Sequence, residues 1–234
     1  SDTIIAPATA VGEGGIAVVR ISGPRALEAL KKYFKPTNIA SSYQSQRLYH
    51  GFIVDQEGRH IDEIMAVYMA APHTYTCDDV VELHCHGSQQ VVKSILSLYL
   101  DFGLRLAEPG EFTYRAFANG RLDLTQAEAV ARLIHSHTDS SRKLALSQVE
   151  GKLSRHIHDF TDQLRQIQVF VEAWIDFPEE ELPDEDLQDI QNKVSQIVDQ
   201  LGELTNTYNT GKLLTEGASI LLIGRPNAGK SSLL

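Results

Sequence analysis

The clearest chemical signature lies at the carboxyl end of the chain, where the spacing G-x-x-x-x-G-K-S begins at Gly224 and ends at Ser231. This spacing is typical of a P-loop, in which successive backbone N–H groups surround the phosphates of a nucleotide. In such a loop Lys230 reaches the terminal phosphates, and the hydroxyl of Ser231 ligates Mg²⁺. The motif therefore predicts a phosphate site for a nucleotide.

The segments on either side of the motif favour this interpretation. Residues 219–223 are mostly apolar, which is typical of a buried parallel strand, and the residues after Lys230 can begin a helix whose N-terminus attracts phosphate. The alternative is a glycine-rich turn after an edge strand. Because a P-loop contacts phosphates and not the base, the motif does not separate GTP from ATP.

The composition excludes several classes of protein. The chain has 234 residues, enough for two domains, and no apolar run approaches the ~20 residues that cross a bilayer. The first residues lack the basic and apolar regions of a signal peptide. Two cysteines form no disulfide framework and, with a P-loop, favour a cytoplasmic location. A net charge of −10 argues against a broad nucleic-acid surface, so RNA contact is expected to be local or supplied by a partner.

The pattern along residues 1–120 predicts a mixed α/β domain. Short apolar or alternating runs predict strands at 15–21, 47–54, 61–69 and 80–86, the second and third joined by a hairpin loop. Helix signals, including Ser88 as an N-cap, predict helices at 25–34, 88–100 and 112–118.

Long helices are expected from residue 121 to residue 216. Thr125 and Glu128 have the spacing of a capping box, and an apolar stripe with steps of three and four runs from Val149 to Trp174. A second stripe runs from Leu187 to Leu204, beyond an acidic, proline-containing segment that we interpret as a solvated loop. The two stripes predict an antiparallel hairpin, and residues 217–234 would begin a nucleotide domain. The fold class is therefore α+β.

Two polar features of the predicted strands leave alternatives open. Strand alternation places Glu82, His84 and His86 on one face, where they could ligate a metal or form the polar wall of a pocket. Arg20, on an apolar strand, could extend to the surface as a structural residue or bind a ligand. The carboxylates have no specific spacing for acid–base chemistry, so the catalytic residues are unassigned.

Five segments together resemble the MnmE (TrmE) family of tRNA modification GTPases. They are residues 14–23, 79–82 with 86–87, 109–129, 172–178 and 224–232. The resemblance spans the whole chain, and the third segment is long enough to be highly specific.

This resemblance implies a fold and an activity. The family is a homodimer with a tetrahydrofolate-binding N-terminal domain, a helical domain and a G domain inserted into the helical domain. With an FAD-dependent flavoprotein partner, MnmG (GidA), it adds aminomethyl or carboxymethylaminomethyl groups at C5 of the wobble uridine of certain tRNAs. The implied one-carbon donor is a tetrahydrofolate, and tRNA would be contacted mainly through the partner. Mg²⁺ and K⁺ would assist GTP hydrolysis.

The resemblance also assigns residues to sites. Arg20, Glu82 and Arg121 match the positions that contact 5-formyltetrahydrofolate. The P-loop residues that would hold the GTP phosphates are Asn227, Ala228, Gly229, Lys230, Ser231 and Ser232. Ser231 would ligate Mg²⁺ and Asn227 would help to bind K⁺. The chain departs from the family at Arg121, where Lys is usual, at Cys77, where Gly is usual, and at Ser88, the second residue of a usual Gly-Gly pair.

The resemblance predicts three domains: a folate-binding and dimerisation domain at 1–120, the first half of the helical domain at 121–216, and the start of the G domain at 217–234. The function expected is that of a GTPase that modifies tRNA. Rival interpretations are a folate-dependent one-carbon transferase, a P-loop ATPase unrelated to tRNA, and a non-enzymatic dimerisation scaffold. No membrane partner is expected.

We expect the 234-residue chain to release no phosphate from GTP or ATP. The sequence contains a P-loop but no further motif of a hydrolysing nucleotide domain, such as a Walker-B aspartate or a base-reading segment. A colorimetric phosphate assay with Mg²⁺ and K⁺ checks this, and release well above the protein-free background would contradict it.

Overall fold

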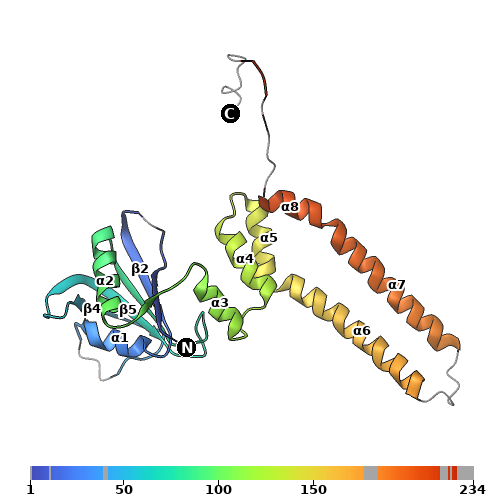
Figure 1. Ribbon diagram of the computed structural model, residues 1–234, viewed down its shortest axis with the longest axis horizontal. Coiled ribbons are helices and arrows are strands. Elements are labelled where there is room, and N and C mark those ends of the chain that lie inside the picture. Colours follow the sequence, from blue (N-terminus) through green and yellow to red (C-terminus); the bar gives the residue numbers. More distant parts are fainter. Residues whose placement is uncertain are drawn as a thin grey trace. The chain divides into compact units, whose positions relative to one another are not determined.

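The computed structural model describes residues 2–10, 12–38, 42–176, 184–216, 221 and 223–225. The chain folds into two compact units, Ser1–Ala127 and Glu128–Leu234. The first unit is built on a β-sheet and the described elements of the second are helices, which confirms the predicted α+β class (Figure 1). The boundaries predicted at 120 and 216 stay predictions.

The first unit contains a seven-stranded sheet with the order β3-β4-β5-β6-β2-β1-β7. All neighbouring strands are antiparallel except β1 and β7, which are parallel. The strands are β1 (Ile4–Pro7), β2 (Gly14–Ser22), β3 (Phe34–Pro36), β4 (Arg47–Val54), β5 (His60–Met69), β6 (Val80–Gly87) and β7 (Arg105–Leu106). The four strands predicted from the sequence are confirmed as β2, β4, β5 and β6.

Two helices bury one face of this sheet. They are α1 (Ala26–Tyr33) and α2 (Gln89–Asp101), and both were predicted (Figure 1). Leu30 of α1 and Ile95 of α2 are fully buried in one core with Val19, Ile21 and Leu83 of the central strands. Because side chains alternate along a strand, the residues directly before and after Val19, Ile21 and Leu83 have side chains on the opposite face of the sheet. Ser88 occupies the N-cap of α2 as predicted, although its side chain makes no capping hydrogen bond.

A short helix and a loop complete the first unit. The helix is α3 (Glu111–Ala118), as predicted, and the loop is residues 70–79, between β5 and β6. The Thr76 hydroxyl lies 2.7 Å from the Ser22 hydroxyl, and Asn119 Nδ2 donates to the Thr76 carbonyl over 2.6 Å. The loop is therefore attached both to β2 and to the residue that follows α3.

The described elements of the second unit are helical. They are most of α4 (Leu124–Ile134), then α5 (Asp139–Val149), α6 (Lys152–Asp176), α7 (Asp184–Asn206) and α8 (Tyr208–Glu216). No described helix combines the length and the apolar character that a bilayer span requires.

The capping box was predicted at Thr125 and Glu128, but it lies two residues earlier in the chain, so this prediction is wrong. Asp123 accepts from the Gln126 N–H over 2.9 Å, and Gln126 Oε1 accepts from the Asp123 N–H over 3.0 Å. This reciprocal pair has the same spacing of three residues. Aspartate and glutamine fill the two roles here, so α4 begins before Thr125.

The long apolar stripes also differ from expectation. Val149 ends α5, and Gly151, with φ of +77°, separates it from α6, so the first stripe crosses two helices. Helix α6 runs outward and α7 returns, as predicted (Figure 1). However, α6 is described in full and none of its residues is buried. The two helices contact each other, and Ile197 of the second stripe is buried, whereas most of the other described stripe residues are half-buried.

Most of the predicted nucleotide segment lies outside the described residues. Leu221 and Ile223 of the predicted strand are described, and both are exposed and outside any strand. A parallel strand needs neighbouring strands for its hydrogen bonds, and the described elements of this unit are helices. The P-loop residues Asn227 to Ser232 and residues 177–183 of the predicted acidic loop also lie outside the described part.

We predict that Gly87→Ala weakens the pairing of β2 with β6. A Cβ at Gly87 would collide with the backbone of Gly14 on the neighbouring strand. Overpacking of this kind typically costs about 1–3 kcal/mol of unfolding free energy. Urea unfolding followed by circular dichroism measures it, and Gly15→Ala, whose Cβ meets nothing within 4 Å, is the control. Equal midpoints for the two variants would contradict the prediction.

Candidate ligand-binding site

The site begins with a charged pair on the two central strands. Arg20 of β2 and Glu82 of β6 are register partners, so both side chains leave the sheet on the face opposite the core. Arg20 Nε donates to Glu82 Oε1 over 2.8 Å, and Arg20 Nη2 lies 2.7 Å from the same oxygen. The two side chains are 28% and 20% exposed. Because both donors use Oε1, Glu82 keeps a second oxygen for other donors.

Two aromatic rings lie close to the guanidinium of Arg20. Its Cζ lies 5.7 Å from the ring centre of Tyr75, in the 70–79 loop, and 5.7 Å from that of Phe112 on α3. The Tyr75 hydroxyl lies 2.9 Å from the Thr113 hydroxyl, which joins the loop to α3. These distances are within the range of cation–π attraction.

Arg121 approaches the same tyrosine. Its Cζ lies 4.9 Å from the Tyr75 ring centre, and one guanidinium nitrogen donates to the Tyr75 carbonyl over 2.8 Å. The structure therefore connects all three predicted folate residues: Arg20 and Arg121 contact Tyr75, and Glu82 binds Arg20. Arg121 lies outside α3, in an exposed turn, so its remaining donors face solvent.

The histidines of β6 have other partners. His84 Nε2 lies 3.4 Å from Glu82 Oε2, whereas His86 pairs through Nδ1 with Asp62 of β5 over 2.7 Å. Among the described residues no group of three or more potential ligands could hold a metal ion. The polar-wall alternative for Glu82, His84 and His86 is thus favoured over the metal alternative. Cys85 points to the core as the alternation predicts, and burial raises the pKa of its thiol to about 11.

The backbone conformation at Cys77 shows why glycine is usual at this position. Cys77 has φ of +62°, in the left-handed region that a side chain makes unfavourable. Glycine, which the family usually has here, adopts this conformation without that cost. Cys77 thus occupies a glycine-like turn within the loop that carries Tyr75.

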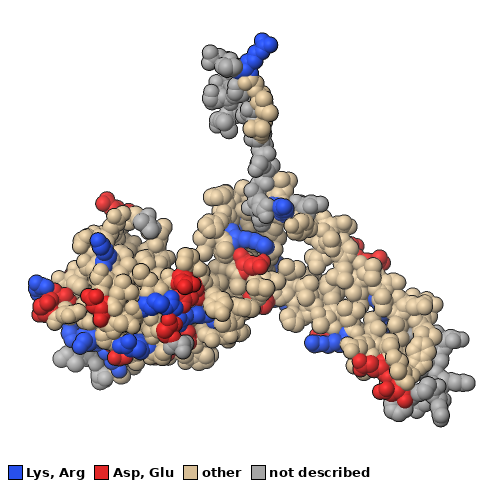
Figure 2. Space-filling model, in the orientation of Figure 1, with Lys and Arg blue, Asp and Glu red and all other residues tan. Residues whose placement is uncertain are grey.

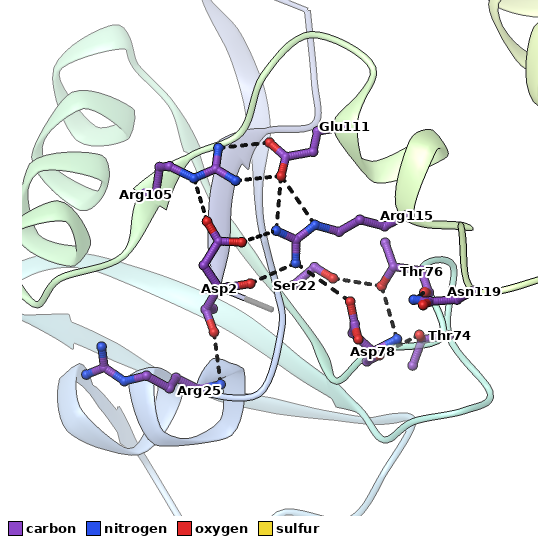
Figure 3. Close-up of polar contacts among 11 residues, drawn as sticks. Asp2, Ser22, Arg25, Thr74, Thr76, Asp78, Arg105, Glu111, Arg115 and Asn119 are labelled. Carbon is purple, nitrogen blue, oxygen red and sulfur yellow. Dashed lines mark hydrogen bonds and ion pairs between the residues drawn. The ribbon is translucent and has the colours of Figure 1, made fainter. Parts of the chain in front are cut away.

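A network of charges lies beside this loop (Figure 3). The Arg105 guanidinium bonds both Glu111, at 2.6 Å, and Asp2, at 2.6 Å. Arg115 bonds the same two carboxylates at 3.0 and 2.7 Å. Hydrogen bonds from Arg105 are the main reason that the pKa of Glu111 falls to about 2, and likewise that of Asp2.

Sequence reasoning missed Tyr75, Phe112, Thr113 and this network. Phe112 and Thr113 lie within the segment that carries the family resemblance, but no motif marks them as site residues. Tyr75 is separated from Thr113 by 38 residues and from Arg121 by 46 residues. No local pattern reports contacts of that range.

Two family models match the chain. The model described as "GTP-binding protein TrmE N-terminus" matches residues 3–121, and the model described as "MnmE helical domain" matches residues 124–224. The chain belongs to the MnmE (TrmE) family. This result confirms the resemblance found in the sequence.

Curated relatives agree with the family models. The chain is 47% identical to the tRNA modification GTPase MnmE of Syntrophotalea carbinolica, 45% identical to that of Natranaerobius thermophilus and 44% identical to that of Aquifex aeolicus. The alignments cover 100%, 100% and 99% of this chain and 51% of each relative. The chain thus spans about half the length of the curated relatives it matches.

The predicted folate residues lie within one family match, and the predicted P-loop site residues lie beyond the other. Arg20, Tyr75, Glu82, Phe112 and Arg121 all lie within the TrmE N-terminal match. The MnmE helical match ends at residue 224, at the first glycine of the P-loop.

An open cavity of about 1130 Å³ in the second unit is lined largely by apolar atoms and by none of the predicted site residues.

We predict that Glu111→Gln destabilises the chain near neutral pH but not near pH 2. The pKa of Glu111 falls from its usual value of 4.5 to about 2. Its stabilisation is therefore complete above pH 4.5 and is lost as the pH falls through 2. Hydrogen bonds to charged groups typically contribute about 1–3 kcal/mol, which is the expected loss at pH 6.

Urea unfolding of both proteins between pH 2 and pH 6 measures this difference. Glu57→Gln is the control, because Glu57 is 66% exposed and, within the described part of the chain, its side chain pairs only with the exposed Arg59. If the unfolding free energies of Glu111→Gln and the unsubstituted chain differ by the same amount at every pH, the prediction is contradicted.

Proposed function

We propose that this chain is part of a GTP-hydrolysing tRNA modification enzyme and that its first unit binds a reduced folate. The observation that carries the proposal is that Arg20 and Arg121 both contact Tyr75 while Arg20 also binds Glu82, within the region that matches the TrmE N-terminus. The names of the relatives support tRNA modification and GTP hydrolysis as the activity of the whole protein.

The site fits the pterin end of a folate. A pterin presents N–H donors along one edge and a flat ring system, so it needs an acceptor and an apolar or aromatic surface. Glu82 offers an oxygen that Arg20 does not use, and Tyr75 and Phe112 offer rings beside it. Carboxylates that accept N–H bonds from a ligand make strong, oriented contacts. Glu82 would thus orient the ring, and the bonds from Arg20 would hold the Glu82 carboxylate in place.

Arg121 fits the other end of the ligand. Its guanidinium is held over the Tyr75 ring and uses one nitrogen for the Tyr75 carbonyl. The donors that remain suit the glutamate carboxylates of a folate, because guanidinium and carboxylate groups pair through two parallel hydrogen bonds. A bound 5-formyltetrahydrofolate or related tetrahydrofolate would supply the one-carbon unit.

The nucleotide and tRNA functions belong to the whole protein. Asn227 to Ser232 would hold the GTP phosphates, with Mg²⁺ on Ser231 and K⁺ beside Asn227. The complete enzyme would act in the cytoplasm as a homodimer, with the FAD-dependent partner MnmG, on C5 of the wobble uridine. On the face shown in Figure 2, acidic and basic side chains are interspersed over the first unit. This distribution supports contact with tRNA mainly through the partner.

We expect the 234-residue chain to bind 5-formyltetrahydrofolate, and Glu82→Gln to weaken binding about tenfold or more. The amide keeps the shape of Glu82 but loses the charge that strengthens its bonds to N–H donors, a loss that typically corresponds to 10-fold or larger effects. Isothermal titration calorimetry gives the dissociation constants of both proteins.

Glu63→Gln is the matched control, because Glu63 is on β5 and pairs only with exposed His50 among the described residues. Circular dichroism establishes that each protein is folded. If the folded chain gives no heat with 5-formyltetrahydrofolate and other reduced folates show no competition, the folate site is refuted. If the two variants bind with equal affinity, the role of Glu82 is refuted.

A further inference from the structure

Arg115 is the one buried residue with a charged side chain in the part of the chain that the structure describes, with its side chain 10% exposed. Burial of a guanidinium is unfavourable unless its donors are paired. Here Nη1 donates to the Asp2 carbonyl over 2.8 Å, and Nη2 donates to Asp2 Oδ1 over 2.7 Å. Glu111, one turn earlier on α3, accepts from Nη2 over 3.0 Å and from Nε over 3.3 Å.

The same guanidinium reaches the loop that carries Tyr75. Its Nη1 lies 3.7 Å from Asp78 Oδ2, and Figure 3 shows the Asp78 carboxylate turned toward Arg115. The loop is closed on itself by the Thr74 hydroxyl, which donates to the Asp78 carbonyl over 2.6 Å. Arg115 therefore contacts one end of a closed turn whose interior includes Tyr75.

Helix α3 carries the other side of the site. Phe112 and Thr113, which contact Arg20 and Tyr75, lie in the helical turn between Glu111 and Arg115. Glu111 is bonded on one side by Arg115 and on the other by Arg105 of β7, and Asp2 bridges the same two arginines (Figure 3). Two cations and two carboxylates thus attach α3 to β7 and to the segment before β1.

We propose that Arg115 is a positioning residue for the ligand site, which it does not itself enter. Through Asp2 and Glu111 it fixes α3 to the edge of the sheet, and through Asp78 it fixes the Tyr75 turn to α3. The rings of Phe112 and Tyr75 are then both held beside Arg20 before a ligand arrives. For its ligand, this inference rests on the folate site proposed above.

Lysine is not equivalent to arginine at this position. A guanidinium presents five donors in a fixed plane, and here they serve Asp2, Glu111 and Asp78 together. An ammonium is a point charge with three donors on a flexible stem and cannot span these partners at once. Arg115→Lys therefore keeps the charge while releasing the contacts that order the turn.

Hydrogen exchange of the ligand-free 234-residue chain tests the positioning directly. In Arg115→Lys we expect amide exchange in residues 74–79 and 111–121 to accelerate about tenfold or more, while exchange in β4 and α2 stays unchanged. Arg59→Lys is the control, because Arg59 is 74% exposed and bonds Asp55 and Glu57 in the β4–β5 turn. Uniform acceleration throughout the first unit, or none in these two segments, would overturn the proposal.

A second variant separates positioning from folding. Asp78→Asn removes the charge that pairs with Arg115 and leaves the bonds of Arg115 to Asp2 and Glu111 in place, so it should accelerate exchange in 74–79 and leave α3 as in the unsubstituted chain. Titration with 5-formyltetrahydrofolate should give dissociation constants raised about tenfold by Arg115→Lys and unchanged by Arg59→Lys. If the unsubstituted chain binds no folate, the proposed function fails, while the exchange data still decide whether Arg115 orders the turn.

Discussion

The antiparallel pairing of β2 with β6 is the constraint on which the site depends. It makes Arg20 and Glu82 direct neighbours and sends both side chains away from the hydrophobic core. The same alternation commits Val19, Ile21 and Leu83 to the core beneath α1 and α2. A shift of one residue in the register would exchange the two faces, so burial of the core also places the charged pair.

Partly buried charges then determine what must surround the sheet. Arg20 is stabilised by Glu82 and by two aromatic rings, which come from a loop and a helix distant in sequence. That loop and helix carry polar groups of their own, and the structure satisfies them through the network of Asp2, Arg105, Glu111 and Arg115. Ion pairs of this kind contribute modestly to net stability but restrict geometry. Their value here is that they order α3 and the Tyr75 turn together.

The family assignment gives these contacts a context. The N-terminal match covers every residue of the site, and the chain spans half the length of its relatives. The first unit has its own core and its own ordered polar cluster, which suits a domain that binds a small ligand. In the second unit most described residues of the two apolar stripes are only half-buried. The two units thus differ in how completely their described residues bury their apolar side chains.

Periodicity and turn residues were sufficient to predict four strands and the three helices of the first unit, whereas Arg20, Glu82 and Arg121 were named as site residues only by the resemblance to the family. These features are local, because alternation, helix period and capping are properties of neighbouring residues. Local patterns were less reliable at element ends, as the start of α4 at Asp123 and the break at Gly151 show. The sequence by itself thus determined most of the elements, the α+β class and the family. Only the tertiary structure decided that Tyr75 and Phe112 lie beside Arg20 and that Arg115 contacts both the helix and the loop that carry them, because these partners lie tens of residues apart and meet only when the sheet, loop and helix pack.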